Sequence, residues 1–206
     1  AYFGENLPED GSVALPGAPG SSSATGIKCR KFRSWNFGTY RQTNEESFNW
    51  PHIRLAEVFL VYAEALIEKD GTISDADLNA SINKVRNRAG LPALSNAFVT
   101  DNGLDMLTEI RRERTIELYG ENSRFNDLKR WGIAEIVLQE DVIGTVIEST
   151  EYETNGLYDP ANYAYGTKTI QTGVGEREAL IIIPSSTRNF SIKNYLFPIP
   201  TNEIVL

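Results

Sequence analysis

Two stretches of this 206-residue chain combine aromatic side chains with polar side chains that can hydrogen-bond to sugars. Residues 32–50 hold six aromatic residues among Asn, Gln and Arg, and residues 152–165 hold four tyrosines among Asn and Asp. Sugars present apolar C–H faces and hydroxyl edges, which aromatic platforms and flanking polar groups recognise. This chemistry predicts a carbohydrate platform built from Trp35, Tyr40 or Trp50, with Tyr158 as a further member.

The same aromatic residues have a second interpretation. Large aromatic side chains are mostly buried in folded proteins, so these residues could instead pin long loops onto the body of the fold. Any that stay exposed could anchor a protein partner rather than a sugar. The residue types alone leave both interpretations open.

Side chains suited to catalysis or metal binding are scarce. His52 is the single histidine and Cys29 the single cysteine, which excludes a His-rich metal site, an internal disulfide and most thiolate sites. There is no phosphate-binding loop, and Gly173-Val174-Gly175 has Glu178 where a dinucleotide-binding motif needs its third glycine. We interpret His52 as a hydrogen-bonding residue at a helix start and Cys29 as an inert thiol.

One acidic group resembles the beginning of a calcium-binding loop. Asp75, Asp77 and Asn79 have the right spacing, but Ala80 occupies the position of the turn glycine. Arg86 stands where a bidentate glutamate is required. A helix N-terminus, where carboxylates are favoured by the helix dipole, explains these residues better.

Two further carboxylate pairs have the residue types of a glycoside hydrolase. They are Glu140-Asp141 and Glu151 with Glu153, and nothing in the sequence places either pair in a cleft. We therefore predict that the protein is not an enzyme, with no catalytic residue, no metal ligand and no cofactor.

Charge and hydrophobic content limit the class of protein. With 20 Lys and Arg against 28 Asp and Glu, the formal net charge is −8, which argues against nucleic acid as a partner because phosphates need a positive surface. With 41% hydrophobic residues the chain can bury a core. Its longest apolar run, Val58 to Ala63, is much shorter than the roughly 18 residues of a membrane-spanning helix.

Hydrophobic periodicity predicts helices over about 53–69, 74–89, 104–119 and 123–138, the last interrupted near Gly132. The first helix is so apolar that it requires cover on most sides. Asp70-Gly71 ends it through a left-handed cap, and Ser74 caps the second helix. The short breaks predict tandem antiparallel helix hairpins of roughly tetratricopeptide length, and therefore a mainly α fold.

The rest of the chain is expected to be irregular apart from a few short strands. Residues 142–152 alternate well enough for a strand, 153–178 look like a long exposed loop, and 180–183 form a short buried strand. The expected organisation is an irregular arm with the aromatic loop (1–52), the helix hairpins (53–138), and a loop-rich region with an extended tail (139–206).

Six positive and five negative side chains crowd into residues 109–130. Because these charges nearly cancel, a phosphate-binding groove is not expected there. We predict interhelical ion pairs instead, with Glu57 and Glu64 as buried partners of arginines.

Four blocks of sequence resemble, in the same order, the SusD/RagB family of surface nutrient-binding lipoproteins. They are the helix from Arg54 to Ala65, the segment from Ile82 to Pro92, the pair Ile110–Leu118 and Arg124–Trp131, and the tail from Tyr195 to Ile204.

The resemblance implies a SusD-type fold of tetratricopeptide-like helix pairs with irregular ligand-holding loops. It implies glycan capture at the outer membrane, facing the exterior, for uptake through a SusC-like TonB-dependent transporter. Family members are longer, so the chain is expected to form the C-terminal part of the fold, with the lipid anchor and an N-terminal part outside it. In the family, Arg54, Glu57, Glu64, Arg111, Arg124 and Trp131 would be scaffold residues.

Three functions follow as alternatives. The first is binding of an oligo- or polysaccharide by the aromatic platform. The second is a helical scaffold that binds no sugar and contacts the transporter or the N-terminal part of the protein. A glycoside hydrolase, which would release products from glycans, is the third and has the least support.

Overall fold

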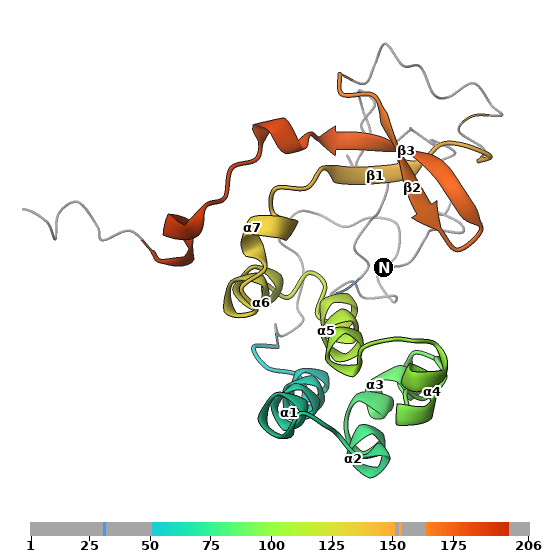
Figure 1. Ribbon diagram of the computed structural model, residues 1–206, viewed down its shortest axis with the longest axis vertical. Coiled ribbons are helices and arrows are strands. Elements are labelled where there is room, and N and C mark those ends of the chain that lie inside the picture. Colours follow the sequence, from blue (N-terminus) through green and yellow to red (C-terminus); the bar gives the residue numbers. More distant parts are fainter. Residues whose placement is uncertain (1–30, 32–50, 151–152, 154–163, 198–206) are drawn as a thin grey trace, which may run out of the picture. The chain divides into compact units, whose positions relative to one another are not determined.

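A computed structural model describes residue 31, residues 51–150, residue 153 and residues 164–197. The chain divides into two compact units, treated separately below: a helical unit, residues 31–124, and a sheet unit, whose described part begins at residue 125. The described residues are mainly helical, as predicted, with seven α-helices and one small sheet (Figure 1).

The helical unit contains five helices: α1 (Leu55–Asp70), α2 (Asp75–Ala80), α3 (Ile82–Arg88), α4 (Asn96–Asp101) and α5 (Met106–Glu117). The predicted end of the first helix is confirmed, because Gly71 has φ +72° and its N–H bonds to the carbonyl of Ile67 at 2.9 Å. The predicted cap of the second is also confirmed, since Ser74 Oγ accepts the N–H of Asp77 at 3.1 Å.

The prediction of one continuous helix over 74–89 is wrong. The chain leaves helical geometry at Ser81 (φ −127°, ψ −102°), where α2 ends and α3 begins. The Ser81 hydroxyl donates to the carbonyl of Asp77 at 2.5 Å, and such local bonding competes with the helix ladder. The sequence reasoning also missed α4, which Ser95 caps by accepting the N–H of Phe98 at 3.1 Å.

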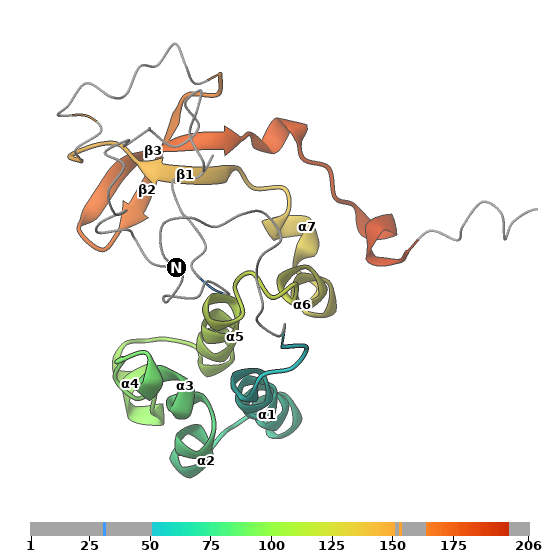
Figure 2. The same cartoon turned by 180° about the vertical axis from the view of Figure 1, so that it is seen from behind.

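The core of the helical unit joins all five helices. Fully buried side chains include Leu60 of α1, Leu78 of α2, Ile82 of α3 and Ile110 of α5, and Val99 of α4 is nearly buried. Helices α1 and α5 lie side by side in both ribbon views (Figures 1 and 2). This shared core fixes the orientation of the polar groups at the ends of both helices.

The sheet unit contains α6 (Arg124–Arg130), except for its first residue, and α7 (Ala134–Val137). The two helices are separated at Gly132 (φ +68°), as predicted. A second core forms where Leu128 and Ala134 pack with Phe190. Two short 3₁₀ helices, η2 (Ser185–Thr187) and η3 (Ile192–Tyr195), follow the sheet.

The sheet has the antiparallel order β1-β3-β2, with β3 in the centre (Figure 2). Its strands are β1 (Val142–Val146), β2 (Thr167–Thr172) and β3 (Gly175–Ile183). The predicted strands at 142–152 and 180–183 are confirmed in part by β1 and β3. The predicted loop over 153–178 is wrong from residue 167 on, because polar residues there form β2 and begin β3.

The polar hairpin escaped prediction for a physical reason. Strand β2 exposes Lys168, Thr169 and Gln171 at the edge of the sheet, and Thr172 pairs with Gly175 across a two-residue turn. Only the far half of β3, around the buried Ala179 and Leu180, has the apolar character that marks a strand in sequence.

Candidate functional site

The four residues predicted to contact sugar, Trp35, Tyr40, Trp50 and Tyr158, lie outside the described residues. Their role therefore stays a prediction. The structure does describe residues next to both aromatic segments. Lys31 precedes the first segment and Arg54 follows it closely, and Tyr165 is the last residue of the second.

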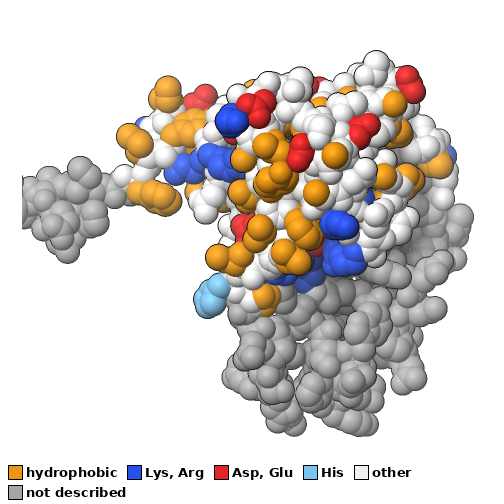
Figure 3. All heavy atoms as spheres, turned by 90° about the horizontal axis from the view of Figure 1, so that it is seen from below, with side chains coloured by type: hydrophobic (Ala, Val, Ile, Leu, Met, Phe, Trp, Pro, Cys, Tyr) orange, Lys and Arg blue, Asp and Glu red, His pale blue; other side chains and the backbone are white. Residues whose placement is uncertain are grey.

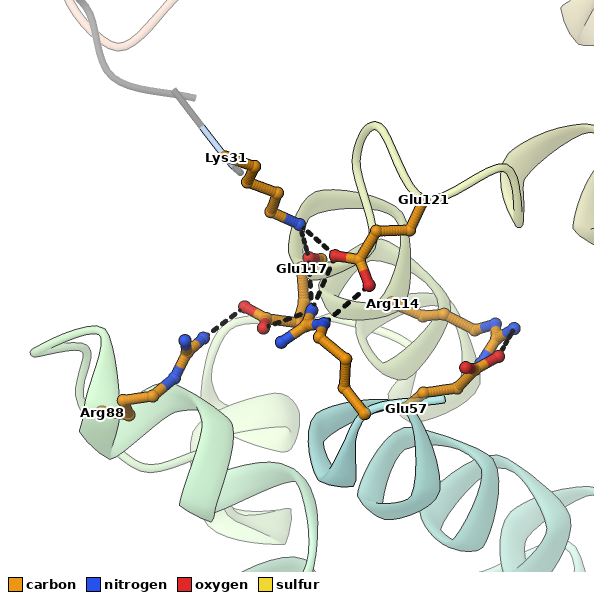
Figure 4. A network of polar contacts seen from close by, with 7 residues as sticks. Lys31, Glu57, Arg88, Arg114, Glu117 and Glu121 are labelled. Carbon is orange, nitrogen blue, oxygen red and sulfur yellow. Dashed lines mark hydrogen bonds and ion pairs between the residues drawn. The ribbon is translucent and has the colours of Figure 1, made fainter. Parts of the chain in front are cut away.

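A cluster of charged side chains lies at the C-terminal end of α5 (Figure 4). Glu117, the last residue of α5, and Glu121 supply two carboxylates. Arg54 donates from Nε to Glu121 Oε2 at 2.6 Å and from Nη2 to Glu117 Oε1 at 2.8 Å. Lys31 Nζ donates to Glu121 Oε1 at 2.5 Å and to the main-chain carbonyl of Glu117. Arg88, the last residue of α3, donates to Glu117 Oε2 at 2.6 Å.

The electrostatics of this cluster favour the charged forms of Glu121 and Arg54. Burial acts to raise the pKa of Glu121, but hydrogen bonds from Arg54 and Lys31 outweigh it and the pKa lies below its usual value. The bond to Glu121 raises the pKa of Arg54 despite partial burial. The Glu117 carbonyl belongs to the last turn of α5, where carbonyls lack helical partners and cations are favoured.

A ladder of ion pairs joins α1 to α5. Arg114 Nη2 lies 3.6 Å from Glu57 Oε1. Arg111 Nε lies 3.6 Å from Glu64 Oε1, and Arg111 Nη2 lies 2.8 Å from Glu68 Oε1. Glu57, near the start of α1, pairs with Arg114, near the end of α5, while Glu64 and Glu68, further along α1, pair with the earlier Arg111. The two helices therefore run antiparallel. The predicted interhelical ion pairs of Glu57 and Glu64 with arginines are confirmed. Glu64 is buried as predicted, whereas the Glu57 side chain is 31% exposed, so the prediction of a buried partner is wrong for Glu57.

The β2–β3 hairpin presents hydrogen-bonding side chains to solvent. Thr169 Oγ1 donates to Glu178 Oε1 at 2.5 Å, and Gln171 Nε2 donates to Glu176 Oε1 at 2.8 Å. Tyr165, just before β2, is 50% exposed. Exposed hydroxyl, amide and carboxylate groups, and an accessible aromatic ring, are the kinds of group that recognise sugars.

Two of the carboxylates considered for glycoside hydrolysis, Asp141 and Glu153, have other partners. Asp141 accepts hydrogen bonds from Lys168 Nζ at 2.6 Å and from the N–H of Ser185 at 2.7 Å, which lower its pKa to about 2. A carboxyl that stays ionised at neutral pH cannot serve as a general acid. Of the second pair, Glu151 lies outside the described residues, and Glu153 accepts the N–H of Ser149 at 2.8 Å.

The calcium-like start at residue 75 is a helix N-terminus, as expected. Asp75 Oδ1 accepts both the N–H and the side-chain amide of Asn96 at 2.8 Å, which joins α2 to α4. His52 is exposed, and it is the pale blue side chain in Figure 3. In the part of the chain that the structure describes, no three His, Cys, Asp or Glu side chains gather as a metal site.

Helix length and hydropathy show whether a helix could cross a membrane. Within the described ranges, none of the helices is long and apolar enough to cross a membrane.

The sequence reasoning missed two members of the α5 cluster, Lys31 and Arg88. The position of Arg88 at the end of an expected helix could have indicated its role, because cations are favoured at helix C-termini. Lys31 had no such signal: it stands outside every expected element, and only the fold brings it to Glu121.

The family model of the SusD family matches residues 4–206 of the chain. A SusD-like protein of Bacteroides ovatus is 34% identical over 96 residues, which are 47% of this chain and 16% of that protein.

Two solved structures, both from Bacteroides fragilis, resemble the fold. A SusD-like carbohydrate binding protein has a TM-score of 0.53 and 28% identity, with 74% of this chain and 26% of that chain covered. A SusD-like protein has a TM-score of 0.52 and 27% identity, with 81% of this chain and 26% of that chain covered. The chain thus spans about a quarter of the length of these structures.

Proposed function

The chain belongs to the SusD family, and from this we propose that it is part of a non-catalytic surface protein that binds oligo- or polysaccharides. The family match over residues 4–206 carries the proposal. The likeness to a solved SusD-like carbohydrate binding protein supports it, and so do the exposed Tyr165 and the polar β2–β3 hairpin beside the second aromatic segment.

We propose the aromatic residues Trp35, Tyr40, Trp50 and Tyr158 as the sugar platform. Each would stack on the apolar face of a sugar ring, while neighbouring Asn, Gln and Arg side chains take its hydroxyls. Tyr165 joins this proposal as an exposed aromatic at the end of the second segment.

Affinity electrophoresis on gels that contain candidate polysaccharides tests the platform. Alanine variants of the four residues are expected to migrate faster than the wild type in at least one gel, because each lost stacking contact weakens retention. The control is Tyr119→Ala, which removes a tyrosine that is 47% exposed and lies outside both aromatic segments. Unchanged retention in every variant, with the fold intact by circular dichroism, contradicts the proposal.

The remaining parts of the proposal concern the cell. We propose that the protein faces the exterior at the outer membrane, through a lipid anchor outside this chain, and passes glycans to a SusC-like TonB-dependent transporter. Co-purification of a large outer-membrane protein with the tagged full-length protein from detergent-solubilised envelopes tests the partnership. Recovery of the tagged protein alone under crosslinking conditions contradicts it.

A second function, a helical scaffold, has one observation in its favour. The face of α1 away from the core carries Leu55, Val58, Val61 and Tyr62, each 46–65% exposed. Figure 3 shows hydrophobic side chains exposed on the surface of the molecule. The solved relatives have about three-quarters of their length outside the matched region. We propose that this face packs against that additional part of the protein.

Cysteine accessibility in the intact protein isolated from cells tests this packing. In a Cys29→Ser background, Val58→Cys and Val61→Cys are expected to react with a maleimide at least about tenfold more slowly than Lys84→Cys, which is exposed on α3. Equal rates at all three positions contradict the scaffold function. Absence of glycan binding by the intact full-length protein favours it.

A further inference from the structure

A series of aromatic rings in the sheet unit leads from its core to its surface. Phe190 is 7% exposed and packs with Leu128 and Ala134 in the core of this unit. Its ring meets that of Tyr195 edge to face, with centroids 5.2 Å apart, and that of Phe125 in the same way at 6.4 Å. Phe125 is already 45% exposed. The core of this unit therefore continues to the surface through aromatic side chains.

The segment around η3 adds large apolar side chains that are almost fully exposed. Ile192 is 79% exposed, and Leu196 and Phe197 are each 78% exposed. We call these three residues, together with Phe125, the tail patch. Lys129 holds two of its rings together, because Lys129 Nζ lies 5.4 Å from the centroid of Phe125 and 4.2 Å from that of Phe197. Apolar side chains that gather in the open in this way mark a site of interaction.

The surroundings of the tail patch are basic, although the protein as a whole is acidic. Residues 125–137 and 185–197 carry four basic and two acidic side chains, whereas the whole chain has a formal net charge of −8. One of the two acids, Asp127, is buried and paired within its own helix. Among the described residues, the ammonium groups of Lys129 and Lys193 have no ion-pair or hydrogen-bond partner. Charge complementarity therefore favours a partner that carries carboxylates.

We infer that the tail patch is an interface covered by a part of the same protein outside this chain, through a segment that combines apolar side chains with carboxylates. The inference goes beyond sugar binding and rests on the additional part of the protein proposed above. In the solved relatives, about three-quarters of the length lies outside the match. An exposed surface that continues a hydrophobic core is typical of a permanent interface, which resembles a core cut in half.

Two other occupants fit the tail patch less well. A symmetric contact between two copies of the chain would bring Lys129 and Lys193 close to the same residues of the other copy, and like charges in contact are unfavourable. An anionic lipid surface would suit the lysines. It would not explain why the patch continues the packing of a protein core.

Cysteine accessibility in the intact full-length protein isolated from cells tests whether the tail patch is covered. In a Cys29→Ser background, Ile192→Cys and Leu196→Cys are compared with Val174→Cys, and mass spectrometry of the labelled peptides measures each rate. Val174 is the matched control, since it is an apolar residue of the same unit, lies in the β2–β3 turn and is also 78% exposed. The two patch positions are expected to react with a maleimide at least about tenfold more slowly than the control. Equal rates overturn the inference.

A photo-crosslinker identifies the occupant. Phe197→p-benzoylphenylalanine and, in a second variant, Leu196→p-benzoylphenylalanine are irradiated in intact cells. The expected product is a crosslink within one protein molecule, to a peptide that lies outside residues 1–206 and contains Asp or Glu. A crosslink to a second copy, to another protein or to lipid overturns the inference, and so does the absence of a crosslink from both positions.

The charge of the partner is tested in the same assay. Lys193→Glu is expected to lower the crosslink yield at least about threefold, because it sets a carboxylate against carboxylates. Lys84→Glu makes the same change at an exposed lysine of α3 and should leave the yield unchanged. Equal yields in the two variants overturn the assignment of an acidic partner segment.

These results are independent of the proposed function. None of the measurements involves a glycan, so a protein that binds no sugar but protects the tail patch contradicts the proposed function and supports the inference. Protection of α1 with an open tail patch overturns the inference alone.

Discussion

At the scale of single residues, charged side chains in the described part of the chain stabilise the fold through ion pairs between its elements. Arg86 and Glu113 are nearly buried, and Arg86 Nη1 donates to Glu113 Oε2 at 2.7 Å. Arg86 Nε also donates to the carbonyl of Pro92 at 2.8 Å. Buried ion pairs are costly to desolvate, so their geometry has to be well satisfied. The crowding of charge in residues 109–130 reflects this internal pairing.

Removing one partner of the buried pair should be strongly destabilising. Glu113→Ala is expected to lower the free energy of unfolding by about 3–5 kcal/mol, because it leaves the Arg86 charge buried without its carboxylate. Urea denaturation followed by circular dichroism measures the change. The double variant Arg86→Met with Glu113→Leu should recover most of the loss, and a double variant as unstable as the single one would contradict this account.

Asp141 gives a pH-dependent prediction. Its folded-state pKa of about 2 lies below the ordinary 3.8, so its bonds to Lys168 and Ser185 stabilise the fold fully above pH 4 and are lost as the pH falls toward 2. Asp141→Asn is therefore expected to be less stable than the wild type at pH 7, with a difference that shrinks between pH 4 and pH 2. Urea midpoints over this range measure it.

The control for Asp141 is its neighbour. Glu140→Gln removes an exposed carboxylate and leaves the bonds of Asp141 in place. It should follow the wild-type stability curve far more closely than Asp141→Asn does. A cost of Asp141→Asn that is the same at pH 7 and pH 2.5 would show that the charge of Asp141 does not stabilise the sheet unit.

At the scale of elements, α1 has two faces of different character. Its inner face buries Leu60 and Ala63 completely, while Val58 and Val61 on the outer face are about half exposed. The many apolar residues of this helix predicted that other parts of the protein cover most of its surface. The described residues cover one side of it. The proposed packing partner accounts for the other side.

The two faces can be told apart by truncation to alanine. Leu60→Ala is expected to cost about 2–5 kcal/mol of unfolding free energy, since it opens a cavity in the core. Val61→Ala on the same helix should change the stability of this chain by less than about 0.5 kcal/mol. Thermal and urea unfolding of both variants measure this, and a similar cost at both positions would contradict the assigned faces.

At the scale of the whole molecule, the chain is a SusD-family fold with two compact units. The finer division into an arm with the aromatic loop (1–52), helix hairpins (53–138) and a loop-rich region (139–206) stays a proposal. In the helical unit, the α5 cluster connects α1, α3 and Lys31. In the sheet unit, the polar hairpin follows the second aromatic segment.

Ligand binding should appear as a gain in stability of the whole chain. A polysaccharide fragment at about 100 times its Kd is expected to stabilise the folded state by about 2.7 kcal/mol. Differential scanning fluorimetry with increasing ligand measures the rise in Tm. Trp35→Ala should lose most of this rise while keeping its ligand-free Tm, and an equal rise in the variant would contradict a role for Trp35 in binding.

The sequence by itself determined the features that depend on local patterns. Apolar periodicity located α1 and α5, Gly71 and Ser74 marked a helix end and a helix start, and four ordered blocks identified the family. These succeeded because capping and periodicity act within a few residues of the chain. The interhelical pairing of Glu57 and Glu64 also followed, from charge neutrality and helix spacing.

Tertiary structure decided the features that depend on contacts between distant segments. Lys31 reaches Glu121 across ninety positions, and Asn83 bonds to the main chain of Leu94 through both ends of its amide. The polar strand β2 exists because β3 supplies its hydrogen bonds. No local pattern encodes such contacts, since their free energy arises only when packing brings the partners together.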